Sequence, residues 1–207
     1  MKLRIRALLL TVLLTLGVLL SSCGGSGMSD EEIRQIYRDL VQQSYELNDI
    51  YYGDGLPFVI SESIMAYLTG VQEGTEGFRV SYMPVSEESP YKYEADIRAA
   101  TAEVFSDSMC SYLYAVGFEG MSTNEDETVA FARYIEQDGV LTVRIDLAEE
   151  ALPMGRTYDF DAMTVIADEA SVIRASFPSY IDGEKSVDVK ITIVKTANGW
   201  RLDSPTD

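Results

Sequence analysis

The sequence predicts an α+β protein in which N-terminal helices pack on a curved antiparallel β-sheet, a meander formed mostly by the C-terminal half of the chain. In the first half, apolar residues recur every three or four positions, which is the period of an amphipathic helix. After about residue 130 they fall in short β-rich runs separated by turn residues, and helices followed by strands are typical of α+β folds. With 46% hydrophobic and 10% aromatic residues among 207, the chain can bury a core.

The chain opens with a targeting pattern. The first six residues include Lys2, Arg4 and Arg6, and residues 7–20 carry no charged side chain. A basic stretch followed by an apolar one is typical of a signal peptide, and this apolar stretch is shorter than the roughly 20 residues that a membrane-spanning helix needs. We therefore expect residues 1–22 to be removed as a signal peptide.

The end of this segment, Leu20-Ser21-Ser22-Cys23, resembles the lipobox of bacterial lipoproteins. The resemblance implies that Cys23 receives a diacylglycerol, becomes the first residue of the mature chain and holds it on the extracytoplasmic face of the bacterial cell membrane. Two acyl chains anchor a protein far better than one. The alternative is a plain signal peptide with an incidental cysteine. We expect residues 23–28, rich in glycine, to form a flexible tether, and residues 29–207 to form one extracytoplasmic domain.

The charge of the chain restricts its partners. Residues 1–22 contain three of the 16 basic residues and none of the 34 acidic ones, which leaves a formal charge of −21 on residues 23–207. Nucleic acid is excluded as a partner, because its binding requires cations that displace counterions from phosphates. The alternatives are an acidic surface that only maintains solubility, and electrostatic capture of a cationic protein or wall component.

Helices are predicted in the first half of the chain. Ser29 and Glu32 form a capping-box pattern, followed by apolar residues at helical spacing over residues 30–48. Two glycines and a proline end this pattern within residues 51–58. Ser89-Pro90 opens a second helical region, and Ser106 caps a short third helix. Their inward faces are predicted to contain Ile97, Thr101, Val104, Phe105, Met109, Leu113 and Val116.

Strands are predicted mainly in the second half. Residues 78–85 form a short edge strand that ends at a proline. Asp138-Gly139 joins two β-rich runs into a hairpin, and Asn198-Gly199 leads into the closing strand. Between them, strands are predicted at residues 163–168, 171–181 and 186–194. In the last of these, alternation places Val187, Val189, Ile191 and Ile193 on one face.

The chemistry of the chain is limited by the absence of histidine from the sequence. Ser-His-Asp and Cys-His mechanisms need an imidazole, and zinc sites need more His and Cys ligands than one remaining thiol, Cys110, supplies. Cys110 lies between apolar residues and is interpreted as a buried small hydrophobe. No phosphate-binding glycine motif is found. We predict no catalytic residue, no metal site and no cofactor.

Several acidic and aromatic residues remain as candidates. A glycan hydrolase that uses two carboxylates is an alternative function, although no pair stands out among 34 acids. Residues 124–127 and 159–161 offer oxygen ligands for Ca²⁺ but match no EF-hand loop, so solvated turns are the simpler interpretation. Tyr51-Tyr52 and Tyr91-x-Tyr93 are candidates for an adhesive surface. A small-ligand pocket is predicted to be lined by Phe105, Tyr112 and Trp200.

Three stretches, EVFSDSMCSYLYAVGF, RYIEQDGVLTV and NGWRLDSPT, resemble small exported domains of Gram-positive bacteria. One similar group is the family of inhibitors of peptidoglycan DL-endopeptidases, which implies an acidic, non-catalytic domain that docks on a basic cell-wall hydrolase. The other is the NTF2-like superfamily, which implies helices on a curved sheet around a small-ligand pocket. No interaction residue of either group matches a position in this chain. The expected partners are the membrane, through the lipid anchor, and a basic hydrolase or wall component.

Overall fold

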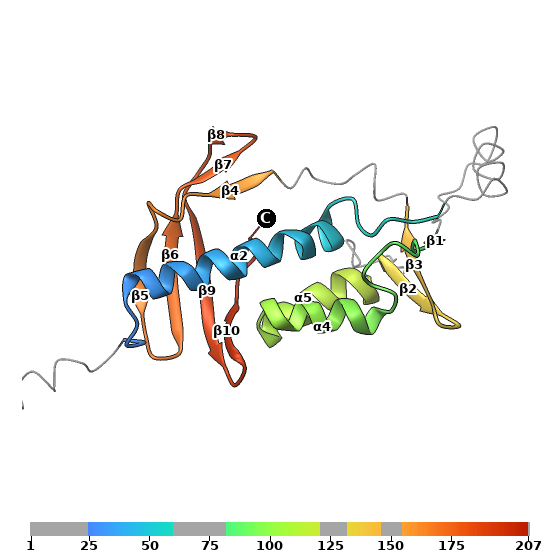
Figure 1. Ribbon diagram of the computed structural model, residues 1–207, viewed down its shortest axis with the longest axis horizontal. Coiled ribbons are helices and arrows are strands. Elements are labelled where there is room, and N and C mark those ends of the chain that lie inside the picture. The colour runs from blue at the N-terminus through green and yellow to red at the C-terminus, as the bar shows by residue number, and fades with distance from the viewer. Residues whose placement is uncertain (1–24, 60–81, 121–131, 146–154, 207) are drawn as a thin grey trace, which may run out of the picture.

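A computed structural model describes residues 25–59, 82–120, 132–145 and 155–206. These residues contain three α-helices and three antiparallel sheets (Figure 1). The predicted α+β class is therefore confirmed, and most of the strands lie in the C-terminal half of the chain. The strands are divided among three sheets instead of forming a single meander.

The long helix α2 (Asp30–Tyr52) begins at the predicted capping box. The Ser29 hydroxyl accepts from the backbone N–H of Glu32 at 3.3 Å, and the Glu32 carboxylate accepts from the backbone N–H of Ser29 at 2.8 Å. The helix continues four residues beyond the predicted end, because nothing before Gly53 interrupts its backbone hydrogen bonding. Its inward face buries Ile33, Tyr37, Leu40, Val41, Ser44, Leu47, Asn48, Ile50 and Tyr51.

The end of α2 is held by a cation from another part of the chain. Its last turn contains no basic residue. The buried side chain of Arg133 lies there instead and donates a hydrogen bond to the carbonyl of Gly53. A positive charge at a helix C-terminus stabilises the partial negative charge of the free carbonyls. We therefore interpret Arg133 as a helix-capping residue.

Two shorter helices follow, α4 (Glu94–Val104) and α5 (Asp107–Tyr114). The second helical region begins four residues later than Pro90, because the Asp96 carboxylate accepts from the backbone N–H groups of Lys92 and Tyr93, at 2.9 Å each, and defines the helix start there. Ser106 caps α5 as predicted, with its hydroxyl 3.2 Å from the backbone nitrogen of Met109.

The chain then continues into a π-helical turn, η1 (Ala115–Glu119), which the sequence pattern did not predict. Cys110 and Leu113 are buried in α5, whereas Met109 and Val116, both predicted to face inward, are only half-buried. The wider turn shifts the helical period after Tyr114 and brings Gly117 against the ring of Tyr51.

The largest sheet contains β5 (Thr164–Asp168), β6 (Val172–Phe177), β9 (Val189–Thr196) and β10 (Gly199–Leu202), in the order β10-β9-β6-β5. The Asn198-Gly199 turn joins β9 to β10 as predicted. The predicted run 171–181 is two strands, because Pro178 lacks the N–H that would continue the ladder.

A second sheet contains two strands from the chain between β6 and β9 and one strand that precedes β5. Its strands are β4 (Arg156–Tyr158), β7 (Ser179–Ile181) and β8 (Glu184–Lys185), in the order β4-β7-β8. Val187 follows β8 and is 70% exposed, so the prediction that it shares the buried face of Ile191 and Ile193 is wrong. β9 begins only at Val189, and alternation holds only within a strand.

The third sheet lies at the other end of α2 (Figure 1) and contains β1 (Tyr82–Pro84), β2 (Tyr134–Gln137) and β3 (Val140–Arg144). Its order is β1-β3-β2, which confirms that β1 is an edge strand of this sheet. Asp138 and Gly139 both have positive φ, 54° and 77°, which is the turn that an Asp-Gly pair favours in a two-residue hairpin.

The core lies between α2 and the largest sheet. The buried hydroxyl of Tyr37 donates to the carbonyl of Ile173 at 2.9 Å and also lies 3.0 Å from that of Ile191. Its ring meets the edge of Phe177 at 5.0 Å between centroids. Ile173, Ile191 and Phe177 are completely buried. This contact joins residues more than 130 positions apart and fixes the direction of α2 across the sheet.

The C-terminus packs against the same inward face of α2, farther along the helix. Thr206 is 1% exposed, and its hydroxyl lies 2.6 Å from that of Ser44 and accepts from the Asn48 side-chain amide at 2.9 Å. The hydroxyl of Tyr158 donates to the Thr206 carbonyl at 3.0 Å. The last described residue is therefore part of the buried hydrogen-bond network.

Candidate functional site

An apolar hollow lies at the end of the molecule formed by β1 and β3. Its volume is about 570 Å³. Three of its side chains are large, apolar or aromatic and well exposed: Val59 at 47%, Tyr93 at 50% and Val140 at 48%. Hydrophobic side chains grouped at one place on a surface are typical of interaction sites. The remaining lining residues are Pro84, Val85, Glu87, Lys92, Gly139 and Leu141.

Local structure explains why these side chains are presented outward. Phe58 forms an antiparallel bridge with Val85, and the backbone N–H of Val59 donates to the Pro84 carbonyl at 3.0 Å. The segment before residue 60 therefore runs beside β1 and carries Val59 to the hollow. On β3, Leu141 is buried, and the alternation of the strand turns its neighbour Val140 to solvent.

Tyr93 is positioned by the start of α4. Its backbone N–H is held by the Asp96 carboxylate, and it has an extended backbone conformation with φ −131°. The neighbouring Lys92 ammonium donates to the carbonyls of Ser86, at 3.3 Å, and Glu87. The one cation of the lining is thus directed at backbone oxygens of the 86–87 turn.

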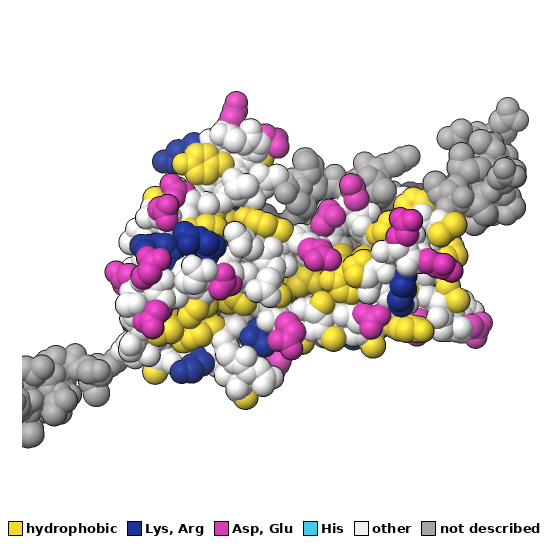
Figure 2. Space-filling view, in the orientation of Figure 1, with side chains coloured by type: hydrophobic (Ala, Val, Ile, Leu, Met, Phe, Trp, Pro, Cys, Tyr) yellow, Lys and Arg dark blue, Asp and Glu magenta, His cyan; other side chains and the backbone are white. Residues whose placement is uncertain are grey.

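Acidic residues border the hollow. Glu87 belongs to the lining, Glu88 follows it, and Asp138 precedes the lining residue Gly139. The Glu136 carboxylate accepts from the backbone N–H of Glu94, next to Tyr93, at 2.9 Å. All four of these carboxylate side chains are exposed. Figure 2 shows acidic and hydrophobic side chains close together over this end of the molecule.

The hollow offers apolar side chains and carboxylates that could contact a partner. An apolar concavity with an acidic border suits a partner that presents an apolar side chain flanked by cations. Glu87 is the one carboxylate among the lining residues, whereas glycoside hydrolysis uses two across the bond that breaks.

The three residues predicted to line a pocket lie in different surroundings. Phe105 is 2% exposed and forms a parallel bridge with Leu202, so it belongs to the core. Tyr112 is 47% exposed on α5, and Trp200 is half-buried on β10. None of them lines the hollow. The helical pattern placed Phe105 on an inward face correctly, but it does not show whether an inward side chain fills the core or lines a pocket. It also gave no indication that Tyr112 is exposed.

Of the four tyrosines predicted as candidates for an adhesive surface, Tyr93 is the one that is exposed. Tyr93 is exposed and lines the hollow. Tyr51 is 1% exposed, and its hydroxyl lies 2.9 Å from that of Thr101. Tyr52 and Tyr91 are half-buried against the core. Val59 and Val140 were not predicted as site residues, because a single exposed valine beside a turn has no sequence signature.

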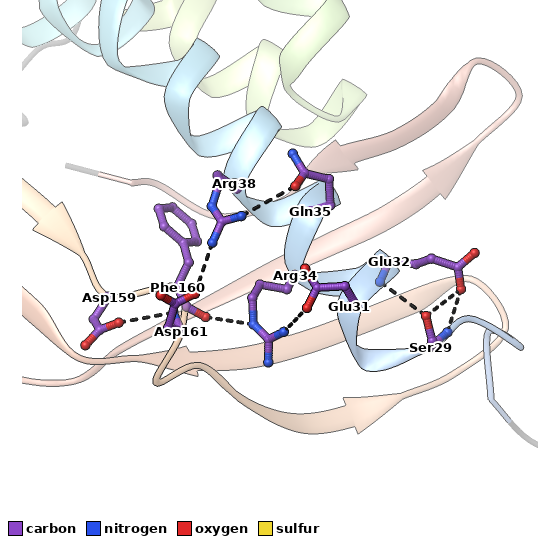
Figure 3. Close-up of polar contacts among 9 residues, drawn as sticks. All are labelled: Ser29, Glu31, Glu32, Arg34, Gln35, Arg38, Asp159, Phe160 and Asp161. Atoms are coloured by element: carbon purple, nitrogen blue, oxygen red, sulfur yellow. Dashed lines mark hydrogen bonds and ion pairs between the residues drawn. The ribbon is translucent and has the colours of Figure 1, made fainter.

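The acidic turn at residues 159–161 has structural partners (Figure 3). The Asp159 carboxylate accepts from the backbone N–H of Asp161 at 3.1 Å, and Asp161 forms an ion pair with Arg38 at 3.2 Å. Arg34 donates to the Phe160 carbonyl at 3.0 Å. These contacts favour the interpretation as a turn clamped to α2. Among the described residues no cluster of His, Cys, Asp and Glu is suited to a metal ion.

Cys110 behaves as predicted for a buried small hydrophobe. It is 6% exposed, and its thiol lies 3.6 Å from the Phe105 carbonyl oxygen. Burial raises the pKa of this thiol, which disfavours the reactive thiolate.

The predicted lipid-attachment residue Cys23 and the lipobox residues Leu20, Ser21 and Ser22 lie outside the described residues, as does the acidic cluster at 124–127. In the part of the chain that the structure describes, no helix has the length and apolar character needed to cross a membrane.

Comparison with known proteins found neither a family whose pattern matches this chain nor a curated protein that is significantly similar to it.

Proposed function

We propose that this protein is a lipid-anchored, extracytoplasmic, non-catalytic binding domain, and that its hollow receives a cationic protein such as a cell-wall peptidoglycan hydrolase. The observation that carries the proposal is the group of exposed apolar side chains, Val59, Tyr93 and Val140, bordered by carboxylates. The lipobox pattern at residues 20–23 supports the location. The formal charge of the whole chain, −18, supports a cationic partner.

The apolar and acidic parts of the site have different roles in this proposal. Burying the three exposed side chains against a partner supplies affinity, at about 25 cal/mol for each Å² of apolar surface removed from water. The carboxylates accelerate encounter with a positive surface and disfavour partners of like charge. Binding is therefore expected to weaken as salt rises, through a slower association rate.

A purified DL-endopeptidase provides the test. The lipoprotein is immobilised, and binding of the hydrolase and loss of its peptidoglycan-cleaving activity are measured at low and high salt. Val140→Lys places a cation in the hollow, and we expect it to abolish both effects. Ile166→Lys is the matched control, since Ile166 is 49% exposed on β5, outside the lining of the hollow. Neither binding nor inhibition by the wild type at low salt would end the inhibitor version of the proposal.

A further inference from the structure

The residues that follow the predicted lipid-attachment site are bound to the domain at one point. The backbone N–H of Ser26 donates to the Asp168 carboxylate at 2.8 Å. Gly25 packs so closely there that a Cβ atom would lie 2.7 Å from the same carboxylate. Met28 packs against the core. This differs from the expectation that residues 23–28 are a flexible tether, because Gly25, Ser26 and Met28 contact the folded domain.

The short chain before this point limits where the anchor lies. Cys23 precedes Gly25 by two residues, and two residues span at most about 7 Å. Asp168 ends β5, next to the turn that leads to β6. A lipid on Cys23 would therefore enter the bilayer close to the β5–β6 turn.

The hollow lies at the opposite end of the molecule. α2 starts four residues after Ser26, and its 23 residues extend about 34 Å at roughly 1.5 Å per residue. Val59, in the hollow, follows the end of α2 by seven residues. Figure 1 shows the start of α2 beside β5 and the β1–β3 sheet at the other end of the longest axis.

We propose that the contact of Ser26 with Asp168 orients the domain on the membrane. Its β5–β6 turn lies at the bilayer surface, and its hollow faces away from the bilayer, toward the cell wall. The inference rests on the proposed lipidation of Cys23. A tether that was free over residues 23–28 would let the domain rotate until the hollow touches the membrane. The bound tether leaves only one residue, Gly24, between the anchor and the domain. The acidic border of the hollow adds repulsion from an anionic bilayer surface. The partner that fits is a cationic macromolecule of the wall space.

Fluorescence resonance energy transfer from a label on the protein to labelled lipids measures which end of the domain lies nearer the membrane. The full gene is expressed in a bacterium that processes lipoproteins, the protein is purified from membranes, and mass spectrometry confirms the lipid on Cys23. Single cysteines replace two exposed residues, Ser171 in the β5–β6 turn and Gln137 at the end of β2, and carry a fluorescent donor. Cys110 is buried and labels poorly. The vesicles contain phosphatidylcholine, phosphatidylglycerol and a headgroup-labelled acceptor lipid.

We expect transfer from the label at residue 171 to exceed that from residue 137 at least about twofold, because roughly 34 Å of helix separates the two ends. Asp168→Ala removes the acceptor of the Ser26 N–H, and the ratio should fall toward one. Glu169→Ala removes the same charge from an exposed neighbour and should leave the ratio unchanged.

The outcomes separate this inference from the proposed function. A lipidated wild type with equal transfer from both labels, or more from residue 137, would overturn the orientation and leave the anchoring intact. A ratio unaffected by Asp168→Ala would overturn the role of the Asp168 contact. An unmodified Cys23 would overturn the anchoring and the orientation together.

Discussion

Replacing Thr206 with valine tests how strongly the end of the chain stabilises the fold. Valine keeps the shape of threonine and lacks its hydroxyl. That hydroxyl lies 2.6 Å from the Ser44 hydroxyl and accepts from the Asn48 side-chain amide at 2.9 Å, and all three residues are at most 3% exposed. The Tyr158 hydroxyl still donates to the backbone carbonyl of residue 206, so the chain end keeps its position.

The expected loss is about 2 kcal/mol of unfolding free energy, since leaving one buried donor without a partner costs about 1–3 kcal/mol. The Asn48 amide is that donor. Ser44 contributes little, because its hydroxyl also donates to the Val41 carbonyl at 2.8 Å. For a chain of this length, such a loss lowers Tm by roughly 4–8 °C.

Urea unfolding followed by circular dichroism measures the change. Thr206→Ser retains the hydroxyl and should lose much less than the valine variant. Thr164→Val makes the same chemical change at an exposed position on β5 and should be nearly neutral. A valine variant at 206 that is as stable as the one at 164 would refute the reasoning, because the buried network would then contribute nothing.

Three further predictions concern helix ends, close packing and pH. Ser29→Ala removes the α2 cap and should lower the free energy of unfolding, measured in urea, by about 1 kcal/mol. An unchanged free energy of unfolding would show that solvent replaces the cap. Gly117→Ala places a Cβ 2.7 Å from the Tyr51 ring and should destabilise by about 1–3 kcal/mol in the same assay, while a neutral result would show that the ring moves freely. Burial raises the pKa of Tyr37, Tyr51 and Tyr134 above the ordinary 10.0, so the unfolded state ionises first; stability is then complete below pH 10.0 and falls above it. As pH is raised above 10.0, tyrosinate absorbance should therefore increase together with unfolding. Ionisation of these tyrosines at pH 10.0 while the protein stays folded would contradict this.

Local patterns predicted those features that neighbouring residues decide. The reciprocal hydrogen bonds of Ser29 and Glu32 join residues three positions apart, and the Asp138-Gly139 turn depends on the φ angles of two adjacent residues. Both were predicted correctly, because nothing distant has to be known to evaluate them.

The candidate site was only partly predictable. Tyr93 belonged to a tyrosine pair that the sequence had indicated as an interaction surface. Val140 became a site residue because β3 pairs with β1 and turns Leu141 inward, and Val59 because its segment runs beside β1. Strand pairing between residues more than 20 positions apart has no local signature.

By itself, the sequence determined the α+β class, the start of α2 and the hairpin turns, because these depend on periodicity, capping and turn conformations within a few residues. Only the tertiary structure decided that the strands form three sheets, that Tyr112 is exposed, and that Thr206 completes a network with Ser44. These outcomes depend on which distant surfaces meet, and burial and hydrogen bonding across such contacts exist only after the chain has folded.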